Sequence, residues 1–156
     1  MDTYRPKRFK LYEIVDKATY EKCSSYQDSG WGLFDPELLR FMDNLMDELE
    51  KEYNRKLTVM CNNWYWNKHT EASDYFQWRG CRTKDYNDFN PNSMHAVVPS
   101  RKVRALDFDI LGLTPKEVQA FIVKNKDKDW CTTRRLEVGV NWNHVDMKHD
   151  IVMFKP

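Results

Sequence analysis

The sequence lacks several features that would assign it at once to a broad class of proteins. No run approaches the roughly 20 apolar residues that span a bilayer, and residues 1–10 are basic and polar, unlike a secretory signal peptide. Its 25 lysine and arginine residues nearly balance its 24 aspartate and glutamate residues, which leaves a net charge of +1. Because this balance gives no sustained field for DNA or RNA, we expect no nucleic-acid partner and no membrane segment.

The four cysteines are widely spaced and form no C-x-x-C pair, which argues against a zinc ribbon or a redox motif. We expect reduced thiols packed as small apolar side chains. No internal repeat and no proline- or glycine-rich linker divides the 156 residues. A chain of this length buries about two-thirds of its unfolded surface in one core. We therefore expect a single domain, residues 1–156, acting as a monomer.

Two segments carry clear helix signals, residues 36–53 and residues 115–123. Asp35 can cap the first helix, and the proline that follows it suits a first helical position. Thr114 and Glu117 form a capping-box pattern at the start of the second helix. Apolar residues recur at helical spacing along the first helix, at Leu38, Phe41, Met42, Leu45, Met46 and Leu49. This stripe predicts a buried helix face and not a cofactor site.

Strand-like patterns follow mostly in the second half of the chain. They cover residues 10–15, 57–61, 104–110, 134–137, 140–147 and 151–154, with a long irregular stretch at residues 62–93. Residues 134–137 and 140–147 predict the two arms of a hairpin around Gly139. Helices early and strands late predict an α+β fold, an antiparallel sheet with flanking helices.

The candidate chemistry lies in two histidines and one carboxylate. His95 and His144 stand in strand-like segments, and Asp107 lies in the strand-like segment between them. Two neutral imidazoles and one carboxylate are a common catalytic zinc set, because three protein ligands leave a position for water, whose pKa the metal lowers to about 7. The other two histidines, His69 and His149, are expected at the surface.

The order of these motifs resembles the zinc D-alanyl-D-alanine carboxypeptidases, a family with relatives among phage endolysin peptidases and the Hedgehog signalling domain. In chain order the matching residues are Ser93 and His95, Ala105 and Asp107, and His144 and Asp146. The turn at residues 79–82 also resembles the family's Ser-Gly-Tyr-Arg turn. The resemblance covers residues 10–147 and is most specific for small phage-encoded members.

This resemblance implies a Hedgehog/D,D-peptidase fold and a Zn²⁺ ion held by His95, Asp107 and His144. It implies that Arg82 grips a carboxylate of the substrate, for which a guanidinium fork is suited, and that Ser93 contributes to substrate binding. The implied substrate is the D-alanine-containing stem peptide of peptidoglycan. The bond that is cut, terminal or within a cross-bridge, stays open.

The sequence departs from the family pattern at two places. Eleven residues separate His95 from Asp107, more than the family usually has, and Asp109 is a rival ligand because it shares a strand face with Asp107. Only Asp107 fits the Ala-x-Asp pattern. Where many relatives carry an acid three residues before the last histidine, this chain has Asn141. We therefore expect Glu137 as the general base, with Asp146 as the alternative.

The resulting expectation is a zinc metallopeptidase that hydrolyses peptide bonds of peptidoglycan, as D,D-carboxypeptidase or endopeptidase. The alternative is a noncatalytic zinc-containing recognition module of the same fold. With no export signal recognised, an enzyme acting on the bacterial cell wall would serve in phage lysis or wall penetration, held in the host cytoplasm before release or carried on the virion.

Overall fold

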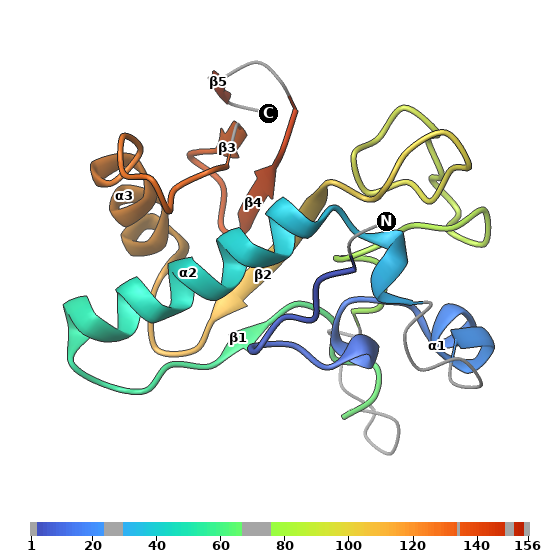
Figure 1. The fold of residues 1–156 in the computed structure, drawn as a ribbon, viewed down its shortest axis with the longest axis horizontal. Coiled ribbons are helices and arrows are strands. Elements are labelled where there is room, and N and C mark those ends of the chain that lie inside the picture. The colour runs from blue at the N-terminus through green and yellow to red at the C-terminus, as the bar shows by residue number, and fades with distance from the viewer. Residues whose placement is uncertain (1–2, 24–29, 67–75, 134, 149–151, 155–156) are drawn as a thin grey trace.

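The computed structural model describes residues 3–23, 30–66, 76–133, 135–148 and 152–154. Its elements, in chain order, are η1 (Leu11–Glu13), α1 (Lys17–Cys23), η2 (Trp31–Leu33), α2 (Pro36–Tyr53), β1 (Val59–Met60), β2 (Ala105–Ile110), α3 (Pro115–Lys124), β3 (Arg135–Glu137), β4 (Asn143–Asp146) and β5 (Val152–Phe154). The predicted α+β class is confirmed (Figure 1).

The strands form one open sheet in the order β1-β2-β4-β3-β5. The pairings among β1, β2, β4 and β3 are antiparallel, as predicted. The last strand differs, because β5 pairs in parallel with β3. Both sides of β4 are occupied by β2 and β3, and β5, which runs opposite to β4, occupies the other edge of β3. In the β2–β4 ladder, Asp107 lies opposite His144.

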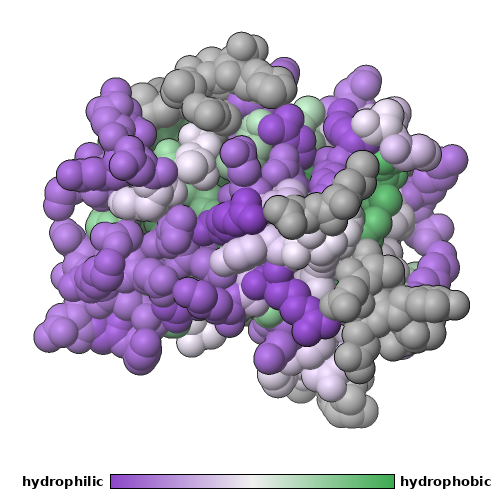
Figure 2. Space-filling view, viewed as in Figure 1, coloured by the Kyte–Doolittle hydropathy of each residue, from purple (hydrophilic) through white to green (hydrophobic). Residues whose placement is uncertain are grey.

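The long helix α2 has the predicted bounds. The Asp35 carboxylate accepts a hydrogen bond from Glu37 N at 3.0 Å, and Asn54, at φ 47°, ends the helix in the left-handed region. Its apolar face shares one hydrophobic core with Leu106 and Phe108 of β2, in front of which the helix passes in Figure 1. The opposite face adds to the largely hydrophilic surface in Figure 2.

None of the described helices combines the length and the apolar character that crossing a membrane requires.

Both arms of the predicted capping box are present at the start of α3. The Thr114 hydroxyl accepts from Glu117 N at 3.3 Å, and the Glu117 carboxylate accepts from Thr114 N at 2.7 Å. The helix buries four residues, Val118, Gln119, Phe121 and Ile122. It contacts β2 and β4, which places it beside the part of the sheet that carries Asp107 and His144.

The prediction of a strand at residues 10–15 is wrong. The Glu13 carboxylate accepts a hydrogen bond from Lys10 N at 2.5 Å and closes a single 3-10 turn. The Glu13 carbonyl then accepts from Asn62 N at 2.8 Å, in a loop instead of a strand ladder. A local side-chain bond therefore competes successfully with strand formation.

The cysteines agree with the sequence analysis. Cys61, Cys81 and Cys131 are buried, Cys23 is partly buried, and all four are free thiols. Burial raises the pKa of the Cys81 thiol to about 12. The three buried cysteines, whose thiol pKa values burial raises, are protonated packing residues at neutral pH.

Candidate metal centre

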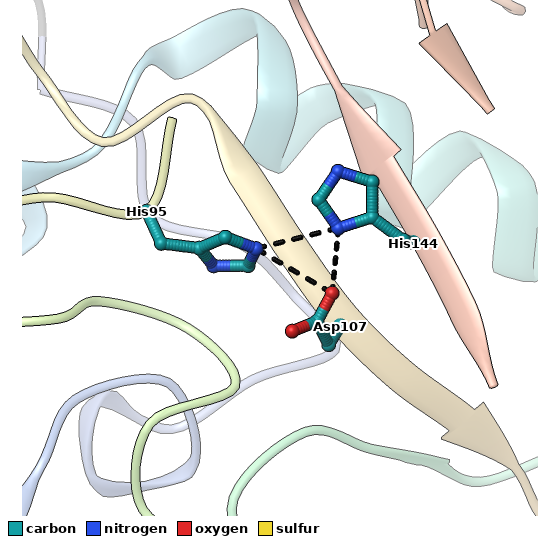
Figure 3. A group of neighbouring side chains, drawn as sticks. All are labelled: His95, Asp107 and His144. Carbon is teal, nitrogen blue, oxygen red and sulfur yellow. Dashed lines mark hydrogen bonds and ion pairs between the residues drawn. The ribbon is translucent and has the colours of Figure 1, made fainter. Parts of the chain in front are cut away.

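Three predicted ligand side chains converge at one point. His95 Nε2 lies 3.3 Å from His144 Nδ1 and 3.4 Å from Asp107 Oδ1, and His144 Nδ1 lies 2.6 Å from the same oxygen. Figure 3 shows the three side chains pointing toward one another. Their potential ligand atoms all lie within 4.8 Å of one another, which is compatible with a shared metal ion. His95 is buried and the other two are partly exposed.

Strands β2 and β4 and one loop position these side chains. Asp107 and His144 are directly opposite each other in β2 and β4. His95 is held by a two-bond bridge, in which Arg82 N donates to the His95 carbonyl at 2.8 Å and Val97 N donates to the Arg82 carbonyl at 2.9 Å. Residues 97–103 then form a loop that is closed where Arg104 N donates to the Met94 carbonyl at 2.8 Å. The long separation between His95 and Asp107 is thus accommodated outside the site.

Each histidine has its far nitrogen bound to an acceptor. His95 Nδ1 lies 2.8 Å from the carbonyl oxygen of Gly80, and His144 Nε2 lies 3.3 Å from Asp146 Oδ2. A neutral imidazole has one N–H and one lone pair, so an N–H directed at these acceptors leaves the lone pairs of His95 Nε2 and His144 Nδ1 facing the centre. Such remote hydrogen bonds are the usual support of metal-binding histidines. The donor set therefore fits a metal ion.

Gly80 is required by the close approach of its turn to the segment after η1. A Cβ atom at this position would fall 1.9 Å from the Ile14 carbonyl oxygen. Only glycine avoids that collision. The turn at residues 79–82 is thereby fixed where the Gly80 carbonyl can accept from His95.

The two candidate aspartates have different partners. Asp107 directs Oδ1 at the histidines, while its Oδ2 accepts from Arg82 Nη2 at 2.8 Å. Asp109 is ion-paired with Arg79 Nη1 at 2.6 Å. The geometry therefore brings Asp107, and not Asp109, to the histidines.

The charges of the cluster are strongly coupled. Burial alone would raise the pKa of the Asp107 carboxyl, but the His95 and His144 imidazoles outweigh burial and hold that pKa far below its usual range. Burial alone would lower the pKa of His144, but hydrogen bonds to Asp107 and Asp146 raise it to about 9. Without a metal, a proton on His144 therefore compensates the buried carboxylates at neutral pH.

The cluster opens into a pocket of about 410 Å³. All seven predicted site residues line it: Arg82, Ser93, His95, Asp107, Glu137, His144 and Asp146. The lining also includes Trp142, Arg135 and Lys148, which are not among the predicted site residues. Arg135 lies opposite Asp146 in the β3–β4 ladder, whereas the predicted turn around Gly139 would have paired it with Asn143, so the sequence carried no signal for this contact. His69 and His149 lie outside the described residues.

The two candidate bases differ in how far their carboxylates are already engaged. Asp146 is buried, accepts from Lys148 N at 2.9 Å, contacts His144 Nε2 and is ion-paired with Arg135 at 3.1 Å. For Glu137, the one side-chain hydrogen bond within the described residues comes from Trp142 Nε1 to Oε2, at 3.3 Å. Both residues are buried; the Asp146 carboxylate is engaged by His144, Lys148 and Arg135, whereas one Glu137 carboxylate oxygen has no hydrogen bond to the described residues.

The predicted carboxylate anchor, Arg82, is partly engaged inside the protein. Besides its bond to Asp107, its Nε donates to the Trp78 carbonyl at 3.0 Å. Its side chain is 25% exposed at the pocket. Only the remaining part of the guanidinium is available for a substrate, and its anchoring role stays a prediction.

Replacing each aspartate of β2 separately tests which one binds the metal. We expect Asp107→Asn to weaken zinc binding by more than the roughly 10- to 100-fold typical of losing a hydrogen bond to a ligand. Asp109→Asn is the matched control and keeps near wild-type affinity, because its carboxylate pairs with Arg79. Titration against a fluorescent zinc chelator measures both. Loss of binding in the Asp109 variant alone would reverse the assignment.

The pKa of His144 gives a second test in metal-free protein. Since folding raises this pKa from 6.5 to about 9, the stabilisation from protonated His144 is complete below pH 6.5 and disappears as the pH rises through about 9. Histidine-selective NMR should show His144 titrating near pH 9, and at lower pH in Asp146→Asn. Because zinc must displace this proton, its affinity should rise by up to roughly tenfold per pH unit below pH 9. A His144 titration at or below pH 6.5 would contradict the described hydrogen bonds.

Comparisons with family models, with curated proteins and with solved structures give no match for this chain. The resemblance to zinc D-alanyl-D-alanine carboxypeptidases therefore rests on the order of the sequence motifs and stays a prediction. The structure itself contributes a possible metal-binding group, His95, Asp107 and His144, at a pocket.

Proposed function

We propose that this protein is a zinc-dependent peptidase that hydrolyses D-alanine-containing peptide bonds of peptidoglycan. The observation that carries the proposal is the pair of imidazoles whose far nitrogens are bound, at Gly80 and Asp146, while their near nitrogens face one Asp107 oxygen. The substrate class comes from the sequence resemblance. The expected setting is phage lysis or wall penetration.

The donor set of two nitrogens and one oxygen suits zinc. Zinc bound here supplies a Lewis acid that polarises a peptide carbonyl and lowers the pKa of a water molecule to about 7. The protein fixes the ligands through their outer contacts. Asp146 orients His144, the Gly80 carbonyl orients His95, and Arg82 holds the second oxygen of Asp107.

Glu137 is the residue to which we assign proton transfer. It lines the same pocket as the three ligands, and Trp142 holds one of its two oxygens. The other oxygen accepts a proton from the attacking water and delivers it to the leaving amine, as general acid–base catalysis requires. Arg82 and Ser93 lie along the same pocket, where they contact the peptide substrate.

A second candidate function is a noncatalytic zinc-containing recognition module. Two observations favour it: Asn141 stands where many relatives have an acid, and the Arg82 guanidinium is already paired with Asp107. In such a module the metal would stabilise the loop and sheet around the pocket. It would bind stem peptides without cutting them.

Incubation of the zinc-loaded protein with isolated peptidoglycan distinguishes these functions. We expect new stem-peptide ends, identified by mass, that vanish with a chelator and return with zinc. Glu137→Gln should keep zinc and lower the rate by about 10²- to 10⁴-fold, because it removes the proton acceptor and preserves the shape.

Asp146→Asn is the comparison variant, and it should act mainly by weakening zinc binding, about 10- to 100-fold. Full hydrolysis by the Glu137 variant would exclude Glu137 as the base. Bound zinc without cleavage of any wall type would favour the recognition module.

A further inference from the structure

A buried glutamine of α3 grips the loop that joins β3 to β4. The side chain of Gln119 is 6% exposed. Its amide nitrogen donates to the carbonyls of Val140 and Trp142, at 3.4 and 3.0 Å, and its amide oxygen accepts from Gly139 N at 3.4 Å. One side chain thus satisfies three backbone groups within four consecutive loop residues. Both hydrogen-bonding functions of the amide are used.

This loop, residues 138–142, has little other internal support. Among the described turn and loop hydrogen bonds between backbone groups, none involves these residues. Gly139 adopts φ +79°, a left-handed conformation that glycine tolerates best. The loop conformation therefore depends on Gln119 more than on its own backbone.

The loop presents Trp142 to the pocket. Its indole N–H donates to Glu137 Oε2 at 3.3 Å, and both side chains line the space in front of His144. Gln119 holds the Trp142 carbonyl, so it constrains the residue whose indole holds the carboxylate. His144 depends on a different support, because the β2–β4 ladder places it opposite Asp107.

We propose that Gln119 is a positioning residue that acts through the loop to hold Trp142 against Glu137. The inference rests on the proposed function for its effect on catalysis, but its structural part is independent of that function. A misplacement of about 1 Å in a catalytic group can cost on the order of 100-fold in rate. The reaction rate should therefore be sensitive to the loss of the three hydrogen bonds with which Gln119 holds the loop.

Gln119→Met tests the proposal, because methionine matches glutamine in length and helix propensity while removing all three bonds. The readout is the indole N–H NMR signal of Trp142, identified by its loss in Trp142→Phe. In Gln119→Met this signal should move toward its position in Glu137→Ala, where the indole has lost its acceptor. Val118→Ala is the matched control: it disturbs the core from the neighbouring position of α3 and should leave the signal in place.

The functional arm measures zinc affinity and hydrolysis on the same variants. We expect Gln119→Met to bind zinc like the wild type and to lose about tenfold or more in kcat with little change in KM. If Gln119→Met does not fold, Gln119→Ala replaces it, because it removes the same three hydrogen bonds and buries no new polar or charged group. An unmoved Trp142 signal in the folded variant would overturn the proposal. Absence of hydrolysis by the wild type would instead overturn the proposed function and leave the NMR result to decide the role of Gln119.

Discussion

Asp107 and His144 face each other across the β2–β4 ladder, and the candidate metal centre depends on this register. A shift by one residue would turn one side chain to the opposite face of the sheet. The register is fixed on the other face, where Leu106, Phe108 and Val145 are buried in the core formed with α2. Burial of each such side chain contributes about 1.5–3 kcal/mol, so slippage would be costly. The apolar core thereby determines the alignment of the polar site.

The negative charges at the site are balanced by neighbouring basic groups. Two acidic side chains, Asp107 and Asp146, are held close to His144, and each has an arginine partner, Arg82 and Arg135 respectively. In metal-free protein a proton on His144 offsets part of this negative charge, since its pKa is about 9. A divalent cation can take over that role at the near nitrogens. Proton and metal therefore compete for one cluster of oppositely charged groups.

Local sequence signals predicted α2 and α3 well, whereas the sequence analysis did not predict α1, Lys17–Cys23. The Asp35 cap, the apolar stripe and the Thr114 capping box all act within a few residues of one another, and α2 has the predicted bounds. The seven predicted site residues came from the resemblance in motif order and not from local signals; the structure brings them to one pocket, and their roles stay predictions. Alternation along β2 could not separate Asp107 from Asp109, because both lie on one strand face. Their arginine partners, distant in sequence, separate them.

The features that the sequence did not reveal depend on contacts between distant segments. Gln119 lies 23 residues before the Trp142 carbonyl that it holds, and no local pattern marks it. The edge that β5 joins, parallel to β3, is not marked by any local pattern, and the 3-10 turn at Leu11–Glu13 depends on one side-chain hydrogen bond. Periodicity contains none of this information.

Zinc anomalous diffraction from crystals of the zinc-loaded protein tests the central claim most directly. We expect one strong peak bounded by His95 Nε2, Asp107 Oδ1 and His144 Nδ1, with zinc–nitrogen distances of about 2.0–2.1 Å. Asp146 should stay on the far nitrogen of His144. A peak on the Asp146 side of His144, or none at this cluster, would contradict the assignment of these residues as the metal centre.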